Sequence, residues 1–277
     1  MGVGKALVYV VFSLTLFLSF TSFFIILPYE QLYKSPYLLI IISIFGLYLL
    51  INIQFHYYKA RTLPPVANPG AEGDSFCEKC NYWKSTKTHH CAVCGKCILG
   101  MDHHCIWINQ CVGSHNHRHF FLFIASLTLA TLIILMAGFN SFYDHVFNYS
   151  TDYTFCSANL HMAPLQPFIC EYDGFARNAV IFCYLLSAVL FLMVGGLTLW
   201  NVYLISIGCT YIDYLQKNGT KRPSGYRKYT SKAANWRNFL GLRRNRTFLK
   251  YVLLPRVFPP ILYENIRRTE SDSSQIV

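Results

Sequence analysis

The sequence predicts an α-helical polytopic membrane protein with four transmembrane helices and a cysteine-rich domain between helices 2 and 3. The composition is the first reason, because 53% of the 277 residues are hydrophobic and only 13% are charged. The second is that four apolar segments approach or reach the length of about 20 residues that a helix needs to cross a bilayer. The third is that seven of the eleven cysteines fall within residues 77–113, between the second and third apolar segments.

The apolar segments follow a short N-terminus, residues 1–6. The first apolar segment is too long for a cleavable signal peptide, whose apolar region has about 7–15 residues, so we expect it to remain as a span. The four predicted spans are residues 7–27, 37–53, 120–139 and 179–199. Residues 55–58 are expected to form an interfacial aromatic belt. Residues 114–119, with three alternating histidines, are expected to be a solvated hinge before the third span.

The distribution of Lys and Arg predicts the orientation. The segments on one side of the membrane, residues 1–6, 54–119 and 200–277, carry 22 of the 24 Lys and Arg. The other side carries only Lys34 and Arg177. Because short cytosolic segments carry the excess of Lys and Arg, both termini and the cysteine-rich domain are expected in the cytosol. The net charge of +11 is then explained by the membrane topology and by attraction of the basic segments to anionic lipid headgroups. Binding to nucleic acid is not needed to explain it.

The segment between the third and fourth spans, residues 140–178, is expected to be a lumenal loop. It contains four acidic residues, and Asn148 begins an Asn-Tyr-Ser glycosylation sequon. Cys156 and Cys170 have two interpretations that the sequence leaves open. They form a lumenal disulfide, or they are two free buried thiols.

Residues 77–113 contain seven Cys and four His, a density that indicates metal binding. Zinc favours four thiolate or imidazole ligands in a tetrahedron, often from C-x2-C pairs, and three such pairs occur here. Mixing these pairs with His indicates reduced thiols on a cytosolic face rather than disulfides. Two closed sites need eight ligands, whereas the stretch offers eleven. The candidates are Cys77, Cys80, His89, His90, Cys91, Cys94, Cys97, His103, His104, Cys105 and Cys111.

If six Cys and two His bind the metals, one thiol remains, and the order Asp102-His103-His104-Cys105 indicates that it is Cys105. A carboxylate, an imidazole and a thiol this close together are the components of an activated nucleophile, because the imidazole takes the thiol proton and the carboxylate orients the imidazole. A second arrangement stays open, in which pairing is sequential and Cys105 is a ligand. It places on one zinc Cys77, Cys80, Cys91 and Cys94, and on the other Cys97, His104, Cys105 and Cys111.

The Asp-His-His-Cys sequence in this cysteine-rich frame resembles the DHHC protein S-acyltransferases, or palmitoyltransferases. The resemblance implies that Cys105 carries the acyl group, that His103 is the base and that Asp102 orients it. It also implies two structural Zn²⁺ ions with interleaved ligands. One set is Cys77, Cys80, His90 and Cys97, and the other is Cys91, Cys94, His104 and Cys111.

Further segments carry the resemblance with some departures. Ile106 stands where the family usually has Pro, and Gln110 where it usually has Asn. Neither is a ligand or a catalytic group, so we expect these departures to tune activity without abolishing it. Residues 210–213 resemble the family's Thr-Thr-x-Glu motif, with Tyr211 and a shorter carboxylate as substitutions. Residues 235–241 resemble its aromatic, Asn-containing C-terminal motif.

By this resemblance the chain is expected to transfer a long-chain acyl group, palmitoyl, from acyl-CoA to cysteine thiols of membrane-associated proteins, through an acyl-Cys105 intermediate in the endoplasmic reticulum or Golgi membrane. Cys105 is then expected at the level of the lipid headgroups, with the acyl chain among the spans. We expect Trp107 and Phe123 to line this acyl cavity, although interfacial packing also explains them. The small side chain of Ala130 is expected near its far end.

Two other classes of function compete with the enzyme. The first is a non-catalytic, zinc-stabilised membrane adaptor in which Cys105 binds metal. The adaptor and the enzyme differ in what the loss of Cys105 would do. In the adaptor the loss would lower the zinc content and the stability of the fold, whereas in the enzyme the zinc would stay and the activity would be lost. The second is a nucleic-acid-binding zinc protein, which the four spans exclude.

Overall fold

The computed structural model describes residues 2–65, 75–85, 87–148, 154–219, 231–242 and 247–257. Four helices in it are long and apolar enough to cross a membrane, which confirms the predicted fold class. These candidate spans are Gly4–Leu32, Pro36–Thr62, His117–Ala137 and Phe175–Ile207. The chain divides into two compact units. Unit 1 comprises Met1–Leu7, Phe55–Leu122 and Leu199–Val277, and unit 2 comprises Val8–Gln54 and Phe123–Thr198.

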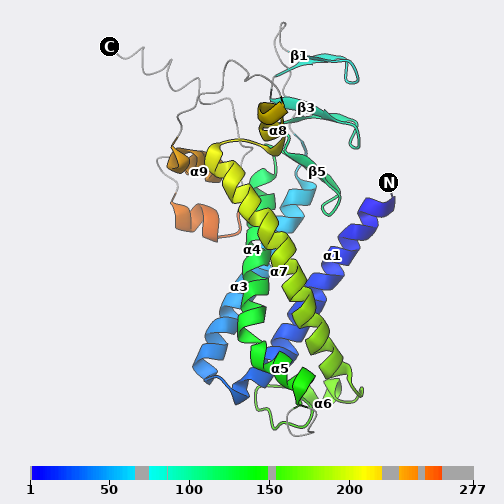
Figure 1. Ribbon diagram of the computed structural model, residues 1–277, viewed down its shortest axis with the longest axis vertical. Coiled ribbons are helices and arrows are strands. Elements are labelled where there is room, and N and C mark those ends of the chain that lie inside the picture. Colours follow the sequence, from blue (N-terminus) through cyan, green and yellow to red (C-terminus); the bar gives the residue numbers. More distant parts are fainter. Residues whose placement is uncertain are drawn as a thin grey trace. The chain divides into compact units, whose positions relative to one another are not determined.

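The long helices form because an apolar segment in lipid must satisfy its backbone hydrogen bonds internally. The first passes from an α-helix through a π-helical turn to a short α-helix and a 3₁₀ turn. These are α1 (Gly2–Thr21), η1 (Ser22–Ile26), α2 (Leu27–Tyr29) and η2 (Glu30–Leu32). The others, labelled in Figure 1, are α3 (Pro36–Thr62), α4 (His117–Ala137) and α7 (Phe175–Ile207). Both α3 and α7 continue beyond the predicted spans, because helical hydrogen bonding does not end where the apolar run ends.

Unit 2 contains the short helices α5 (Phe139–Phe147) and α6 (Gln166–Ile169), and two buried carboxylates, Glu30 and Asp144, have hydrogen-bond partners in or next to α5 and the end of the first span. Glu30 accepts hydrogen bonds from the Ser141 amide at 2.8 Å and from the Asn140 side chain at 3.1 Å. Asp144 accepts one from the Tyr29 hydroxyl at 2.9 Å. A buried carboxylate without such partners would be costly, so these bonds fix the ends of the helices that carry them.

The loop between α5 and α7 is closed by a disulfide between Cys156 and Cys170. Phe155 and Ile169, each beside one of the cysteines, are buried in the core of unit 2. The Asn148 side chain donates a hydrogen bond to Asp144 at 2.7 Å, and the rest of its sequon lies outside the described residues.

The cysteine-rich part of unit 1 consists of three two-stranded antiparallel hairpins (Figure 1). Their strands are β1 (Ser75–Cys77) with β2 (Tyr82–Lys84), β3 (Thr88–Cys91) with β4 (Lys96–Leu99), and β5 (His103–Cys105) with β6 (Gln110–Val112). Among the described residues, three helical segments follow α7. They are α8 (Tyr211–Gly219), α9 (Lys232–Leu240) and η4 (Leu249–Leu253).

Two expectations about the edges of the spans are wrong. His56 and Tyr57, expected at the interface, are 1% and 2% exposed. These side chains are buried because the end of α3 belongs to unit 1 and packs within it. There the Nδ1 atoms of His56 and His119 lie 2.9 Å apart.

The histidines of residues 114–119, expected in a solvated hinge, are also buried. Here α4 begins at His117. In the turn before it, the Ser114 amide donates to the Leu99 carbonyl of the second hairpin at 3.0 Å, and the Asn116 side chain donates to the Cys111 carbonyl of the third hairpin at 2.9 Å.

Candidate active site and metal centres

Two of the three C-x2-C pairs, Cys77/Cys80 and Cys91/Cys94, lie at the tight turns of hairpins. After Cys77, the amide of Asn81 donates to the Cys77 carbonyl at 2.7 Å, and Asn81 has a positive φ of 55°. The equivalent turn after Cys91 uses Gly95, with φ +61° and a 2.9 Å bond to the Cys91 carbonyl. Asn and Gly adopt the left-handed backbone conformation more readily than other residues do. Asn81 and Gly95, each four positions after the first Cys of its pair, therefore permit the tight turn that brings the two thiols to one side.

The hairpin register explains why the two ligand sets are interleaved. His90 pairs with Cys97 across β3 and β4, and His104 pairs with Cys111 across β5 and β6. Each cross-strand His–Cys pair meets the C-x2-C turn of the hairpin before it. The resulting groups are Cys77, Cys80, His90 and Cys97, and Cys91, Cys94, His104 and Cys111. They have the same members as the two sets that the resemblance implies.

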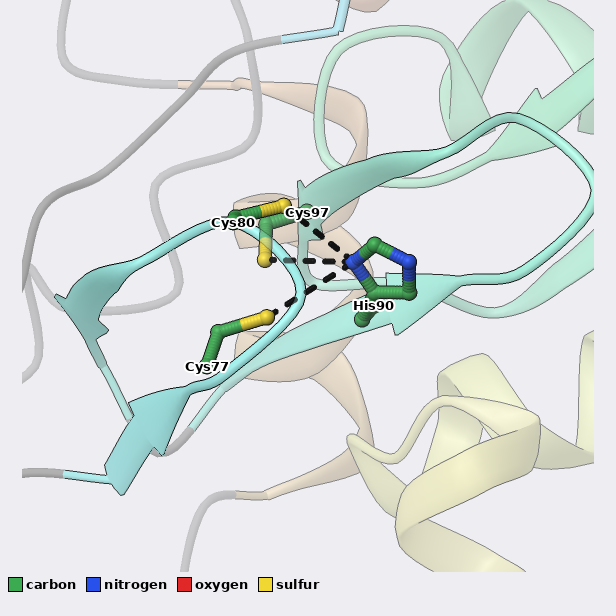
Figure 2. Close-up of side chains that lie close together, drawn as sticks. All are labelled: Cys77, Cys80, His90 and Cys97. Atoms are coloured by element: carbon green, nitrogen blue, oxygen red, sulfur yellow. Dashed lines mark hydrogen bonds between the residues drawn. The ribbon is translucent and has the colours of Figure 1, made fainter.

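The first group is shown in Figure 2, where three sulfur atoms surround the Nδ1 atom of His90. The distances from Nδ1 are 3.6 Å to Cys77, 3.2 Å to Cys80 and 3.9 Å to Cys97. One imidazole nitrogen cannot form three hydrogen bonds, whereas a zinc ion bound at about 2.3 Å from sulfur has ligands about 3.8 Å apart. The ligand atoms of each group lie within 4.8 Å of one another, so each group can hold a metal ion.

The second group has the same geometry. The Nδ1 atom of His104 lies 3.7 Å from Cys91, 3.4 Å from Cys94 and 3.5 Å from Cys111. Neither group contains Cys105, although all seven cysteines of the stretch are among the described residues. Cys105 is instead the last residue of β5 and is 7% exposed.

Asp102 and His103 form a hydrogen-bonded pair beside this thiol. The Nδ1 atom of His103 lies 2.8 Å from Oδ2 of Asp102, which is 3% exposed. Burial by itself would lower the pKa of His103, but its hydrogen bonds to Asp102 and to Cys105 raise that pKa to about 9. Because Nδ1 is bound to the carboxylate, Nε2 is the nitrogen that remains to exchange a proton with Cys105.

The other oxygen of Asp102 is bound by the start of α8. The Tyr211 amide, the first N–H of that helix, donates to Oδ1 of Asp102 at 2.6 Å. Burial acts to raise the pKa of Asp102, but the hydrogen bonds to His103 and Tyr211 and the nearby imidazole of His117 lower it on balance. Both oxygens of the carboxylate therefore have fixed partners, and the ring of His103 has one orientation.

The helix that supplies this amide is itself fixed to the cysteine-rich domain. Thr210 and Asp213 cap α8 reciprocally, with each side chain accepting the other's backbone amide at 3.2 Å. Asp213 also forms an ion pair with Lys87 at 2.9 Å. Thr210 and Asp213 lie in a motif that the sequence resemblance indicated, whereas no pattern in the sequence pointed to Lys87. The capping-box spacing of residues 210 and 213 was the signal for a helix start.

One of the three residues expected in an acyl cavity lines an apolar cavity of unit 2. This cavity is lined by α1, η1, α2, α3 and α4, together with Gly138, and Ala130 is part of its wall. Phe123 is buried and Trp107 is 51% exposed, and neither is among the described residues that line this cavity. Trp107 has another contact, since its carbonyl accepts a hydrogen bond from Tyr57 at 3.0 Å.

Comparison with known proteins matches this site to a family. Residues 71–218 match the family described as DHHC palmitoyltransferase, which includes both metal groups, residues 102–105 and the start of α8. The chain belongs to the DHHC palmitoyltransferase family. This confirms the resemblance seen in the sequence and the prediction that the chain is a protein S-acyltransferase.

Curated relatives support the same conclusion. The chain is 32% identical to palmitoyltransferase ZDHHC16A of Danio rerio, over 93% of this chain and 76% of that protein. It is 32% identical to ZDHHC16 of Mus musculus and 30% identical to ZDHHC16 of Homo sapiens, in each case over 74% of this chain. The match spans 58% of the mouse protein and 59% of the human protein.

Proposed function

We propose that the protein transfers a long-chain acyl group, palmitoyl, from acyl-CoA to cysteine thiols of other proteins, with Cys105 as the acyl carrier. The observation that carries the proposal is the arrangement of Asp102, His103 and Cys105. His103 and Cys105 are two residues apart in β5, so the imidazole and the thiol lie on the same face of the strand; the imidazole is oriented by a buried carboxylate, and the thiol belongs to neither metal group. These are the parts of a nucleophile activated by an adjacent base.

In the first half-reaction, His103 Nε2 takes the proton of the Cys105 thiol, and the sulfur attacks the thioester carbonyl of acyl-CoA. The new C–S bond forms as the bond to the CoA sulfur breaks. His103 returns the proton to the leaving CoA thiolate. Asp102 stays ionised throughout and stabilises the imidazolium, because Oδ2 accepts its Nδ1–H while Oδ1 is fixed by the Tyr211 amide.

The second half-reaction is the first with the thiols exchanged. A cysteine of the protein substrate gives its proton to His103, and its sulfur attacks the acyl-Cys105 carbonyl. The acyl–Cys105 bond breaks, and the Cys105 thiolate recovers a proton from His103. One acyl group has moved between two thiols, and no oxidant or reductant is consumed.

We propose that the two metal groups each bind one structural Zn²⁺. Three Cys and one His leave no open coordination position, which is typical of zinc that stabilises a fold. Bound zinc would hold the thiolates of each group together and so fix the hairpins. This assignment argues against the adaptor, which requires Cys105 as a ligand, because the sequential pairing is not the grouping that the hairpins form.

The partners and location follow from the same chemistry. We propose acyl-CoA as the donor and membrane-associated proteins with cytosolic cysteines as acceptors, in the endoplasmic reticulum or Golgi membrane. The asymmetry of Lys and Arg supports a cytosolic cysteine-rich domain and cytosolic termini. The wall around Ala130 is chemically suited to an acyl chain, since it is almost entirely apolar. Asn148 remains our candidate for glycosylation.

The test compares wild type, Cys105→Ser and Cys209→Ser in detergent with labelled palmitoyl-CoA. Cys209 is a suitable control because it is a buried thiol of unit 1 outside both metal groups. We expect hydroxylamine-sensitive label on wild type and Cys209→Ser, no label on Cys105→Ser, and about two zinc ions per chain in all three. Unchanged label on Cys105→Ser would exclude Cys105 as the carrier, and reduced zinc in that variant would favour the adaptor.

A further inference from the structure

The end of α3 is packed against the hairpin that carries Cys105. On this part of the helix His56, Tyr57 and Ala60 are at most 2% exposed, whereas Tyr58 is 56% exposed. Ala60 is four residues after His56 and three after Tyr57, so the three side chains lie on one face of the helix, and that face is buried. Because residues 55–63 and the β5–β6 hairpin both belong to unit 1, the buried face is part of the same compact body as the nucleophile.

The last carbonyls of α3 are satisfied by residues that follow Cys105. The Gln110 amide donates to the carbonyls of Ala60 at 3.2 Å and Leu63 at 2.7 Å. The Asn116 amide donates to Ala60 at 2.7 Å and to the Cys111 carbonyl at 2.9 Å. A helix leaves its last four carbonyls without helical partners, so these amides act as its C-terminal cap. Since Gln110 lies directly opposite Cys105 in the hairpin register, the cap fixes one side of the nucleophile's strand pair.

Tyr57 fixes the turn itself. Its hydroxyl donates at 3.0 Å to the carbonyl of Trp107, two residues after Cys105 and in the middle of the β5–β6 turn. Asn109 closes the same turn with a positive φ of 52°, and a methyl group at Gly4 would overlap its side chain. The turn is therefore held by contacts outside the hairpin, and the Tyr57 bond is the one made at its centre.

We infer that Tyr57 is a positioning residue for acyl transfer, which holds the turn after Cys105 so that the thiol stays aligned with His103. The inference rests on the proposed function. It assigns Tyr57 no contact with substrate and no proton transfer. Its effect is geometric, and a displacement of about 1 Å at a reacting centre can lower a rate by about a hundredfold.

Tyr57→Phe removes one hydroxyl and keeps the buried ring, and Tyr58→Phe is a matched control on the exposed face of the same helix. We expect the maximal rate of Cys105 acylation to fall at least about tenfold in Tyr57→Phe. The half-saturating palmitoyl-CoA concentration and the zinc content should equal those of wild type. Tyr58→Phe should match wild type in every measurement.

Three results would overturn the inference. The first is that Tyr57→Phe has wild-type kinetics. The second is that only its half-saturating palmitoyl-CoA concentration changes. The third is that zinc is lost together with the rate, which would show that Tyr57 only supports the fold.

A second readout does not need the enzyme to be active. It is the alkylation of Cys105 by N-ethylmaleimide, measured by mass spectrometry. We expect severalfold faster alkylation in Tyr57→Phe, because a released turn exposes the thiol. If wild type takes up no label but this alkylation difference is present, the proposed function fails, whereas the part of the inference that Tyr57 holds the turn after Cys105 stands.

Discussion

Replacing Asp102 by Asn should remove most of the acyl-transfer activity while leaving the metal groups intact. In the native site Oδ1 accepts the Tyr211 amide at 2.6 Å and Oδ2 accepts His103 Nδ1–H at 2.8 Å. Asn offers one acceptor and one donor, so it cannot accept from both. If its NH₂ faces Tyr211, two donors meet in a buried position. If it faces His103, Nδ1 becomes the acceptor, and Nε2 carries a proton and cannot take one from Cys105.

The magnitude follows from these two arrangements. Losing a hydrogen bond to a charged group costs about 1.5–3 kcal/mol, which alone lowers a rate by about 10–100-fold. Where the wrong tautomer also results, the same change in Ser-His-Asp proteases lowers kcat by about 10⁴. We therefore expect the acylation rate of Cys105 to fall by about 10²–10⁴.

Single-turnover acylation with labelled palmitoyl-CoA measures this rate, and zinc per chain is read on the same samples. Asp173→Asn is the control, since Asp173 is an exposed carboxylate. Amide hydrogen exchange at Tyr211 reports the second consequence and should accelerate in Asp102→Asn only. An acylation rate within a fewfold of wild type would refute the role of Asp102, and a loss of zinc would show that Asp102 supports the fold instead.

Two further predictions concern the supports of the site and of unit 2. Asp213→Asn breaks the ion pair with Lys87, whose side chain is 35% exposed, so solvent screening limits the loss to about 0.5–1 kcal/mol and a few degrees of melting temperature. Asp213→Asn should cost less in a Lys87→Met background than in wild type, as read in thermal melts, and equal losses in the two backgrounds would contradict a direct pairing. Cys156→Ala opens the loop to Cys170, 14 residues along the chain, and should destabilise the protein by about 3 kcal/mol. Reductant should lower the melting temperature of wild type but not of this variant, and equal sensitivity in both would contradict the prediction.

The sequence by itself determined the membrane architecture and the chemistry of the cysteine-rich domain. Apolar segments of spanning length have few alternatives in lipid, because only internal hydrogen bonding satisfies their backbone. The seven Cys and four His of residues 77–113 likewise indicated metal, and the order of residues 102–105 indicated a nucleophile. These conclusions depend on composition and on local order, which require no knowledge of the fold.

Which ligand belongs to which metal group was decided by tertiary structure. Spacing alone allowed both a sequential and an interleaved assignment, and only the resemblance favoured the second. The hairpin register separates them, because it pairs His90 with Cys97 and His104 with Cys111 across strands. The same register leaves Cys105 opposite Gln110 and outside both groups.

The surroundings of the proposed catalytic residues also depended on contacts between distant segments. Tyr57 was expected in an interfacial belt, yet it is buried against the turn that follows Cys105. Asp102 receives an amide from Tyr211, 109 residues away, where the side chain departs from the family motif but the backbone supplies the bond. A sequence pattern reports the periodicity of a helix and the chemistry of its side chains. Which backbone group reaches a buried carboxylate depends on how the helices and hairpins pack, and packing is a property of the folded chain.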